Sequence, residues 1–207
     1  INRAPAKTQA ALFEVMEEKQ ITIDGSTYNM SAPFVVLATQ NPIEQEGTYR
    51  LPEAQLDRFL FKINVEYPNA EEELQIILKE QALENTTKAS KIETVISGDK
   101  IIEFRNLVNQ IKIEENLLKY IANIVVNTRS NSFLYLGASP RASIAILGAS
   151  KAFAAIEGRD FVTPEDIKKA TIPVLQHRVI VTPEREMEGV TSKQIIAQII
   201  EAVEIPR

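Results

Sequence analysis

The chain has 207 residues, of which 44% are hydrophobic, and this is enough for one large domain or two small ones with real cores. Its 23 Lys and Arg against 28 Asp and Glu give a formal net charge of −5 without a basic cluster, which argues against a strong nucleic-acid surface. The absence of Cys and the single His exclude disulfides, thiol nucleophiles and Cys-ligated or paired-imidazole metal sites, and favour a reduced, cytoplasmic setting.

The first 70 residues predict a mixture of helix and strand. Residues 4–18 carry apolar side chains at helical spacing after a proline, which is typical of an amphipathic helix. A hairpin is predicted next, because Asp24-Gly25 tolerates the positive φ of a tight turn. Continuous apolar runs at residues 34–38 and 59–65 predict two strands, the first buried on both faces inside a parallel sheet.

Helices dominate the rest of the sequence. Asn69 with Glu72 three residues later predicts a capped helix that runs to about Leu83, and residues 85–98 are polar and variable. Ser139 and Thr163 are hydroxyl caps that each precede a proline, a pattern typical of helix starts. The expected helices after residue 98 span residues 101–111, 114–128, 140–157, 164–176 and 192–203.

This order of elements predicts an α/β fold class in two parts. Residues 1–84 are expected to form part of an α/β core, with a helix, a β-hairpin, a buried strand and a connecting helix. Residues 85–207 are expected to form an all-α domain. No internal repeat or low-complexity segment is present.

The sequence contains no phosphate-binding loop. Its seven glycines are at least ten positions apart, so neither GxxxxGK[ST] nor GxGxxG can be written. No apolar strand ends in an Asp-Glu pair that could hold Mg²⁺. The chain also begins with Ile1 rather than Met, and a two-stranded parallel sheet would be poorly covered. We therefore expect further residues upstream of Ile1.

Five segments resemble the MoxR family of AAA+ ATPases, in the family's order and over nearly the whole chain, least over residues 85–98. They are INRAPAKTQ (residues 1–9), ATQNP (38–42), EQEGTY (44–49), LPEAQLDRF (51–59) and GASPRA (137–142). In this family INRA directly follows the Walker B acids. The resemblance therefore implies a partial AAA+ core followed by a helical lid, with Walker A and Walker B before residue 1.

The resemblance assigns roles to three residues, Asn41, Arg58 and Arg141. Asn41 matches sensor 1, whose carboxamide contacts the attacking water and the γ-phosphate; an ordinary Asn-Pro turn is the alternative. Arg58 matches the arginine finger, supplied in trans, and a surface ion pair with Glu53 or Asp57 is the alternative. Arg50 is a second candidate for the finger.

Arg141 matches sensor 2, which reaches from the lid to the nucleotide of the same subunit. Independently of the family, Ser139 and Pro140 place Arg141 at the positive end of a helix, where a cation is disfavoured unless an anion is near. A side chain extended into solvent is the alternative.

Other candidates are interpreted as structural. His177 is expected near a helix end as a dipole partner or packing residue, and Glu44 and Glu46 as solvated acids. Stripes such as that of Ile144, Ile146 and Leu147 are expected to be core faces. The hairpin resembles an insert that related ATPases point toward a central pore, where Tyr28 would touch substrate or only pack across the strands.

The resemblance implies that the intact protein hydrolyses MgATP between subunits of a hexameric ring. The work would be chaperone-like remodelling or maturation of partner proteins, often ones with von Willebrand factor A domains. The chain alone is expected neither to bind ATP tightly nor to hydrolyse it, and no metal site or membrane span is expected. One alternative is a non-enzymatic interaction module on an AAA+ scaffold, and another is a helicase-like motor, against which the acidic balance argues.

Overall fold

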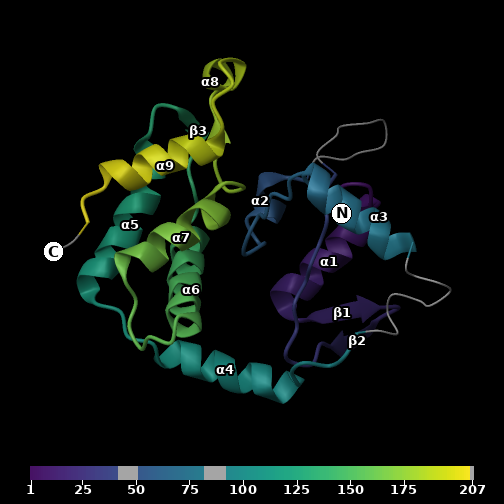
Figure 1. The fold of residues 1–207 in the computed structure, drawn as a ribbon. Coiled ribbons are helices and arrows are strands. Elements are labelled where there is room, and N and C mark those ends of the chain that lie inside the picture. Colours follow the sequence, from purple (N-terminus) through teal and green to yellow (C-terminus); the bar gives the residue numbers. More distant parts are fainter. Residues whose placement is uncertain (42–50, 82–91, 206–207) are drawn as a thin grey trace.

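The computed structural model describes residues 1–41, 51–81 and 92–205. Its elements form two groups with α4 running between them, as Figure 1 shows. The first group consists of α1 (Ala6–Glu18), β1 (Gln20–Ile23), β2 (Ser26–Asn29), α2 (Glu53–Leu56) and α3 (Ala70–Gln81). Then come α4 (Gly98–Gln110), α5 (Glu115–Ser130), β3 (Leu134–Leu136), α6 (Pro140–Ile156), α7 (Pro164–Leu175), β4 (Ile180–Val181), α8 (Pro183–Met187) and α9 (Ser192–Ala202).

The predicted hairpin is confirmed. Strands β1 and β2 pair antiparallel from Gln20–Asn29 to Ile23–Ser26. The turn between them has positive φ at both central residues, 49° at Asp24 and 78° at Gly25. This is the conformation that a tight hairpin turn requires, and it explains the choice of Asp-Gly.

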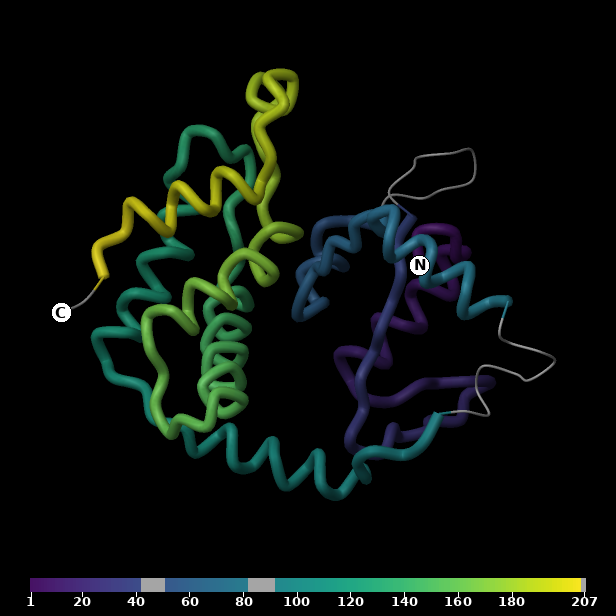
Figure 2. The backbone as a smooth tube through the Cα atoms, in the orientation of Figure 1, coloured from purple at the N-terminus to yellow at the C-terminus, as the bar shows by residue number. Residues whose placement is uncertain are grey.

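The two predicted strands at residues 34–38 and 59–65 are not formed. In the described part of the chain the sheets are two antiparallel pairs, β1–β2 and β3–β4. The chain runs extended through residues 31–41 (Figure 2), but Leu37 is 92% exposed and Val65 is 91% exposed. A strand buried on both faces needs paired neighbours and covering layers, and no described segment supplies them.

The hydrophobic core lies in the second group. Helices α5, α6, α7 and α9 pack on one another, and Ile124, Ile146, Ile167 and Ile195 are fully buried at their contacts. The predicted core stripe on α6 is only partly right, because Ile144 is 70% exposed. Pattern reading also missed the short elements β3, β4 and α8, since two or three residues carry too little periodicity.

Side-chain caps fix the helix starts where the sequence predicted them. The Ser139 hydroxyl accepts a hydrogen bond from the Arg141 backbone N–H at 3.2 Å. Thr163 and Asp166 form a reciprocal capping box at the start of α7. Asn69 accepts from the backbone N–H of Glu72, whose carboxylate accepts in return from that of Asn69. Among the described helices, none is long and apolar enough to cross a membrane.

Candidate functional site

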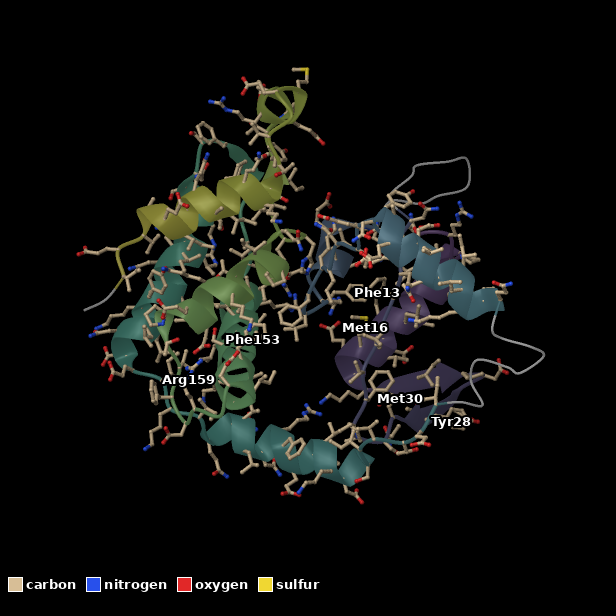
Figure 3. All side chains as sticks on the ribbon, viewed as in Figure 1. Phe13, Met16, Tyr28, Met30, Phe153 and Arg159 are labelled. Carbon is tan, nitrogen blue, oxygen red and sulfur yellow. The ribbon has the colours of Figure 1, made fainter. Side chains whose placement is uncertain are left out.

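A groove of about 690 Å³ separates the two groups of elements. Met16 of α1 and Phe153 of α6 approach it from opposite sides, as Figure 3 shows. Its wall on α6 is mostly apolar and includes the small residues Ala145, Gly148, Ala149 and Ala152. Its charged lining residues are Glu17, Asp57, Arg58, Arg141 and Arg178. A groove of this size with a few convergent polar groups is typical of a small-molecule site.

Glu17 joins the two arginines that the sequence singled out. Its carboxylate forms an ion pair with the Arg58 guanidinium and lies 3.3 Å from Nη2 of Arg141. The hydrogen bond from Arg58 lowers the pKa of Glu17, and the charge of Arg141 lowers it further. Among the described residues, Arg58 thus pairs with Glu17 on α1, instead of the neighbouring acids that the ion-pair alternative named.

Asp57 is the second carboxylate of this cluster. It follows α2 and accepts a hydrogen bond from the Ser139 hydroxyl at 2.8 Å and from Nε of Arg178 at 3.0 Å. Nη1 of Arg141 lies 3.5 Å from the Asp57 carboxylate. The same residue therefore contacts the cap of α6, the arginine of its first turn and the segment that follows α7.

The cluster holds one more positive than negative charge. Three guanidinium groups, those of Arg58, Arg141 and Arg178, share the carboxylates of Glu17 and Asp57. Two of the three arginines, Arg58 and Arg141, remain partly exposed to the groove. Guanidinium groups that line a groove suit the oxygens of a phosphate, and the N-terminus of α6 adds a favourable dipole.

Asn41 lies apart from this cluster. Its backbone C=O accepts from the Asn2 side-chain amide at 3.1 Å, and its backbone N–H donates to the Asn2 Oδ1 at 3.3 Å. Asn41 is not among the residues that line the groove. The structure thus brings Arg58 and Arg141 together and places Asn41 beside the start of the chain.

The remaining candidates divide into buried, exposed and undescribed residues. His177 is largely buried, its Nε2 lies 3.0 Å from the Phe59 carbonyl oxygen, and burial lowers its pKa to about 4. It is therefore a neutral packing residue rather than a charged dipole partner. Tyr28 is 56% exposed on the hairpin. Arg50, Glu44 and Glu46 lie outside the described residues.

Two residues of the cluster, Glu17 and Arg178, were not singled out from the sequence. Glu17 lies in the last turn of an ordinary amphipathic helix, and it meets Arg141 across 124 positions of sequence. Arg178 lies 121 positions from Asp57. Only the fold brings these partners together. An acid in the last turn of a helix is disfavoured by the helix dipole, and this is the one local irregularity that marks Glu17.

Comparisons with known proteins cover both groups of elements. The family described as "ATPase family associated with various cellular activities (AAA)" matches residues 1–61, and the AAA lid domain matches residues 126–199. The chain is 42% identical over 206 residues to the uncharacterized protein YeaC of Bacillus subtilis. This match covers all of the chain and 63% of YeaC. The chain is 39% identical over 216 residues to the chaperone MoxR1 of Mycobacterium tuberculosis, and covers 56% of that protein.

A solved structure agrees with the fold. A crystal structure from Cytophaga hutchinsonii, provisionally described as an ATPase, superposes with a TM-score of 0.91 at 43% identity. It covers all of this chain, which spans 64% of the solved one. Fold and matches define an AAA+ core segment with its helical lid. The chain belongs to the MoxR family of AAA+ ATPases.

Proposed function

We propose that the complete protein hydrolyses MgATP at the interfaces of a hexameric ring and uses this to remodel or mature partner proteins, in the cytoplasm. The family assignment and the chaperone MoxR1 among the relatives support this proposal. Proteins with von Willebrand factor A domains are the partner class that the family resemblance suggests. Residues 1–84 would act as part of the nucleotide-binding core and residues 85–207 as the lid.

The observation that carries the proposal is the shared ion pairing of Arg58 and Arg141 with Glu17. Two guanidinium groups held by one carboxylate are close enough to bind one phosphate group, and too close to serve nucleotides on opposite faces of a subunit. We therefore propose that Arg58 and Arg141 act as a pair on the same nucleotide. This differs from the expectation that sensor 2 serves its own subunit while the finger serves the neighbour.

The position of Asn41 supports the proposal that the arginine pair serves the nucleotide of the neighbouring subunit. The resemblance places the Walker B acids immediately before residue 1, and the Asn2 side chain binds both backbone groups of Asn41. Asn41 would thus lie beside those acids as sensor 1 of the same subunit. Since Asn41 does not line the groove, the arginine pair would face the nucleotide of the neighbouring subunit.

The arginine pair fits the phosphates of ATP, whereas Mg²⁺ would need other ligands. No group of three His, Cys, Asp or Glu side chains that could hold a metal ion occurs within residues 1–41, 51–81 and 92–205. Bound Mg²⁺ would neutralise the phosphate charge that develops during transfer. Because the sequence contains no phosphate-binding loop, we expect the chain by itself neither to bind ATP tightly nor to hydrolyse it.

Mixing experiments with the complete gene product test this arrangement. We expect Arg58→Ala, Arg141→Ala and Asn41→Ala each to lower ATP turnover, Arg58→Ala by about 10³-fold. Each site would combine Asn41 of one subunit with the arginine pair of the next. Rings mixed equally from Asn41→Ala and Arg58→Ala subunits should therefore regain about a quarter of the active sites, because only one in four pairings is intact.

Mixed rings of Arg58→Ala and Arg141→Ala subunits should stay inactive, because every subunit then lacks one member of the pair. Recovery of turnover in that mixture would show that the two arginines serve different nucleotides. An unmodified protein without turnover that still bound partner proteins would instead favour the interaction-module alternative.

A further inference from the structure

Arg178 is a buried arginine for which the proposed chemistry has no direct use. It lies just beyond the end of α7, and only 3% of its side chain is exposed. Burial lowers the pKa of Arg178, while its hydrogen bond to Asp57 opposes that effect. A charged group is costly to bury unless all its donors are bonded, so the partners of Arg178 indicate what it does.

Apart from the Val174 carbonyl of α7, to which Nη1 also donates, its partners among the described residues lie on both sides of Arg58. Nε donates to the Asp57 carboxylate at 3.0 Å and Nη2 to the Asp57 carbonyl at 2.9 Å. Nη2 also donates to the Phe59 carbonyl at 2.6 Å, and Nη1 donates to the Leu60 carbonyl at 3.1 Å. One side chain from the lid thus binds the backbone immediately before and after Arg58.

Residues next to Arg178 also bind the segment that follows Arg58. The Gln176 side chain donates to the Lys62 carbonyl, and the Lys62 backbone N–H donates to the Pro173 carbonyl at 3.0 Å. His177 lies against the Phe59 carbonyl. The end of α7 therefore holds the whole segment from residue 57 to residue 62 on the lid.

Asp57 connects this attachment to Arg141. Its carboxylate accepts from the Ser139 hydroxyl, which also caps the helix whose first turn carries Arg141. Arg178 and Ser139 bind the same carboxylate from two parts of the lid. The positions of Arg58 and Arg141 relative to each other thus depend on the bonds that Asp57 makes.

We propose that Arg178 is a positioning residue: through Asp57 and the carbonyls that flank Arg58, it holds Arg58 at a fixed place beside Arg141. This inference rests on the proposed function, since it concerns how the arginine pair is presented to a phosphate. Arginine is required because its planar fork supplies five donors, whereas lysine has one ammonium group that cannot reach these acceptors together.

The test is the substitution Arg178→Lys in the complete gene product, with Arg159→Lys as the matched control. Arg159 forms a bidentate pair with the buried Asp166, with N–O distances of 2.7 and 2.8 Å, and does not line the groove. Both substitutions should lower the melting temperature. Only Arg178→Lys should lower ATP turnover, by about 10²-fold, the effect of a small misplacement of a catalytic group.

Subunit mixing separates positioning from a general structural defect. Arg178→Lys subunits mixed equally with Asn41→Ala subunits should regain about a quarter of the active sites, because Arg178→Lys leaves the Asn41 face intact. The same subunits mixed with Arg58→Ala subunits should regain none, because both defects affect the arginine pair. If Arg178→Lys does not fold, Asp57→Asn, which keeps an acceptor for Arg178, replaces it in both mixtures.

Three outcomes would overturn the inference. They are unchanged turnover in Arg178→Lys, equal loss in Arg159→Lys, and recovery when Arg178→Lys and Arg58→Ala subunits are mixed. An unmodified protein without ATP turnover would overturn the proposed function itself, and the positioning role with it.

Discussion

At the scale of single residues, the site pairs two charges that are each unfavourable in their own helix. Glu17 lies in the last turn of α1 and Arg141 in the first turn of α6, so the dipole of its own helix disfavours each charge. They lie 3.3 Å apart and offset one another. A phosphate at this place would compete with Glu17 for both arginines. Local rules are commonly broken at functional sites, and here the break coincides with the proposed phosphate site.

His177 gives the protein a pH dependence of known sign. Its pKa is about 4 in the folded state, chiefly through burial, against 6.5 for an exposed imidazole. As pH falls below 6.5, the unfolded chain binds a proton that the folded chain does not. The free energy of unfolding should therefore fall by roughly 2 kcal/mol between pH 7 and pH 5. The loss should level off as the pH falls through 4, where the folded protein also binds the proton. Urea denaturation at several pH values measures the effect.

The matched control is His177→Gln. A glutamine side chain can still donate to the Phe59 carbonyl but does not titrate. Because the 207 residues contain one histidine, this variant should lose the dependence between pH 7 and pH 5. If its profile matches that of the unmodified protein, another group causes the dependence.

At the scale of elements, the loop from β3 to α6 is fitted tightly against the end of α5. The Ala138 backbone N–H donates to the Thr128 hydroxyl at 3.0 Å, and the Ala138 carbonyl accepts from Arg129 Nε at 2.8 Å. A Cβ on Gly137 would lie 2.6 Å from the Arg129 Cα. Gly137→Ala must therefore displace backbone, and we expect it to lower the free energy of unfolding by about 1–3 kcal/mol.

Gly148 in the middle of α6 is the control, because a Cβ there meets no atom within 4 Å. Gly148→Ala should raise stability by roughly 0.5–1 kcal/mol through helix propensity alone. Thermal unfolding of both variants measures the difference. A Gly137→Ala variant as stable as Gly148→Ala would show that this loop is not closely packed.

Local signals in the sequence predicted the helices well and the strands poorly. Caps such as Ser139 and Thr163 act within three residues, so they are readable before the fold is known. The apolar runs at residues 34–38 and 59–65 require partners from elsewhere, and no local pattern reveals whether these exist. The same difference between local and long-range signals holds for the residues of the site. Family motifs indicated Arg58 and Arg141, whereas Glu17 and Arg178 became visible only through contacts between distant parts of the chain.

At the scale of the whole molecule, the hydrophobic core lies almost entirely on one side of α4. The residues of the main core cluster fall between Leu117 and Ile200. In the described residues up to 81, the buried hydrophobic side chains are Phe13, Val15 and Leu51. The lid thus has a core of its own, while the first group exposes apolar side chains such as Leu37 and Val65.

We therefore predict that residues 92–205 fold alone and that residues 1–81 do not. The lid fragment should unfold cooperatively on heating, followed by circular dichroism, because a domain folds independently when its core is contained within it. In that fragment Ile167→Ala should cost about 2–5 kcal/mol, since Ile167 is fully buried. Ile144→Ala should change little, because Ile144 is 70% exposed on the groove side of α6. A gradual transition, or equal effects of the two substitutions, would mean that the lid depends on the first group for its core.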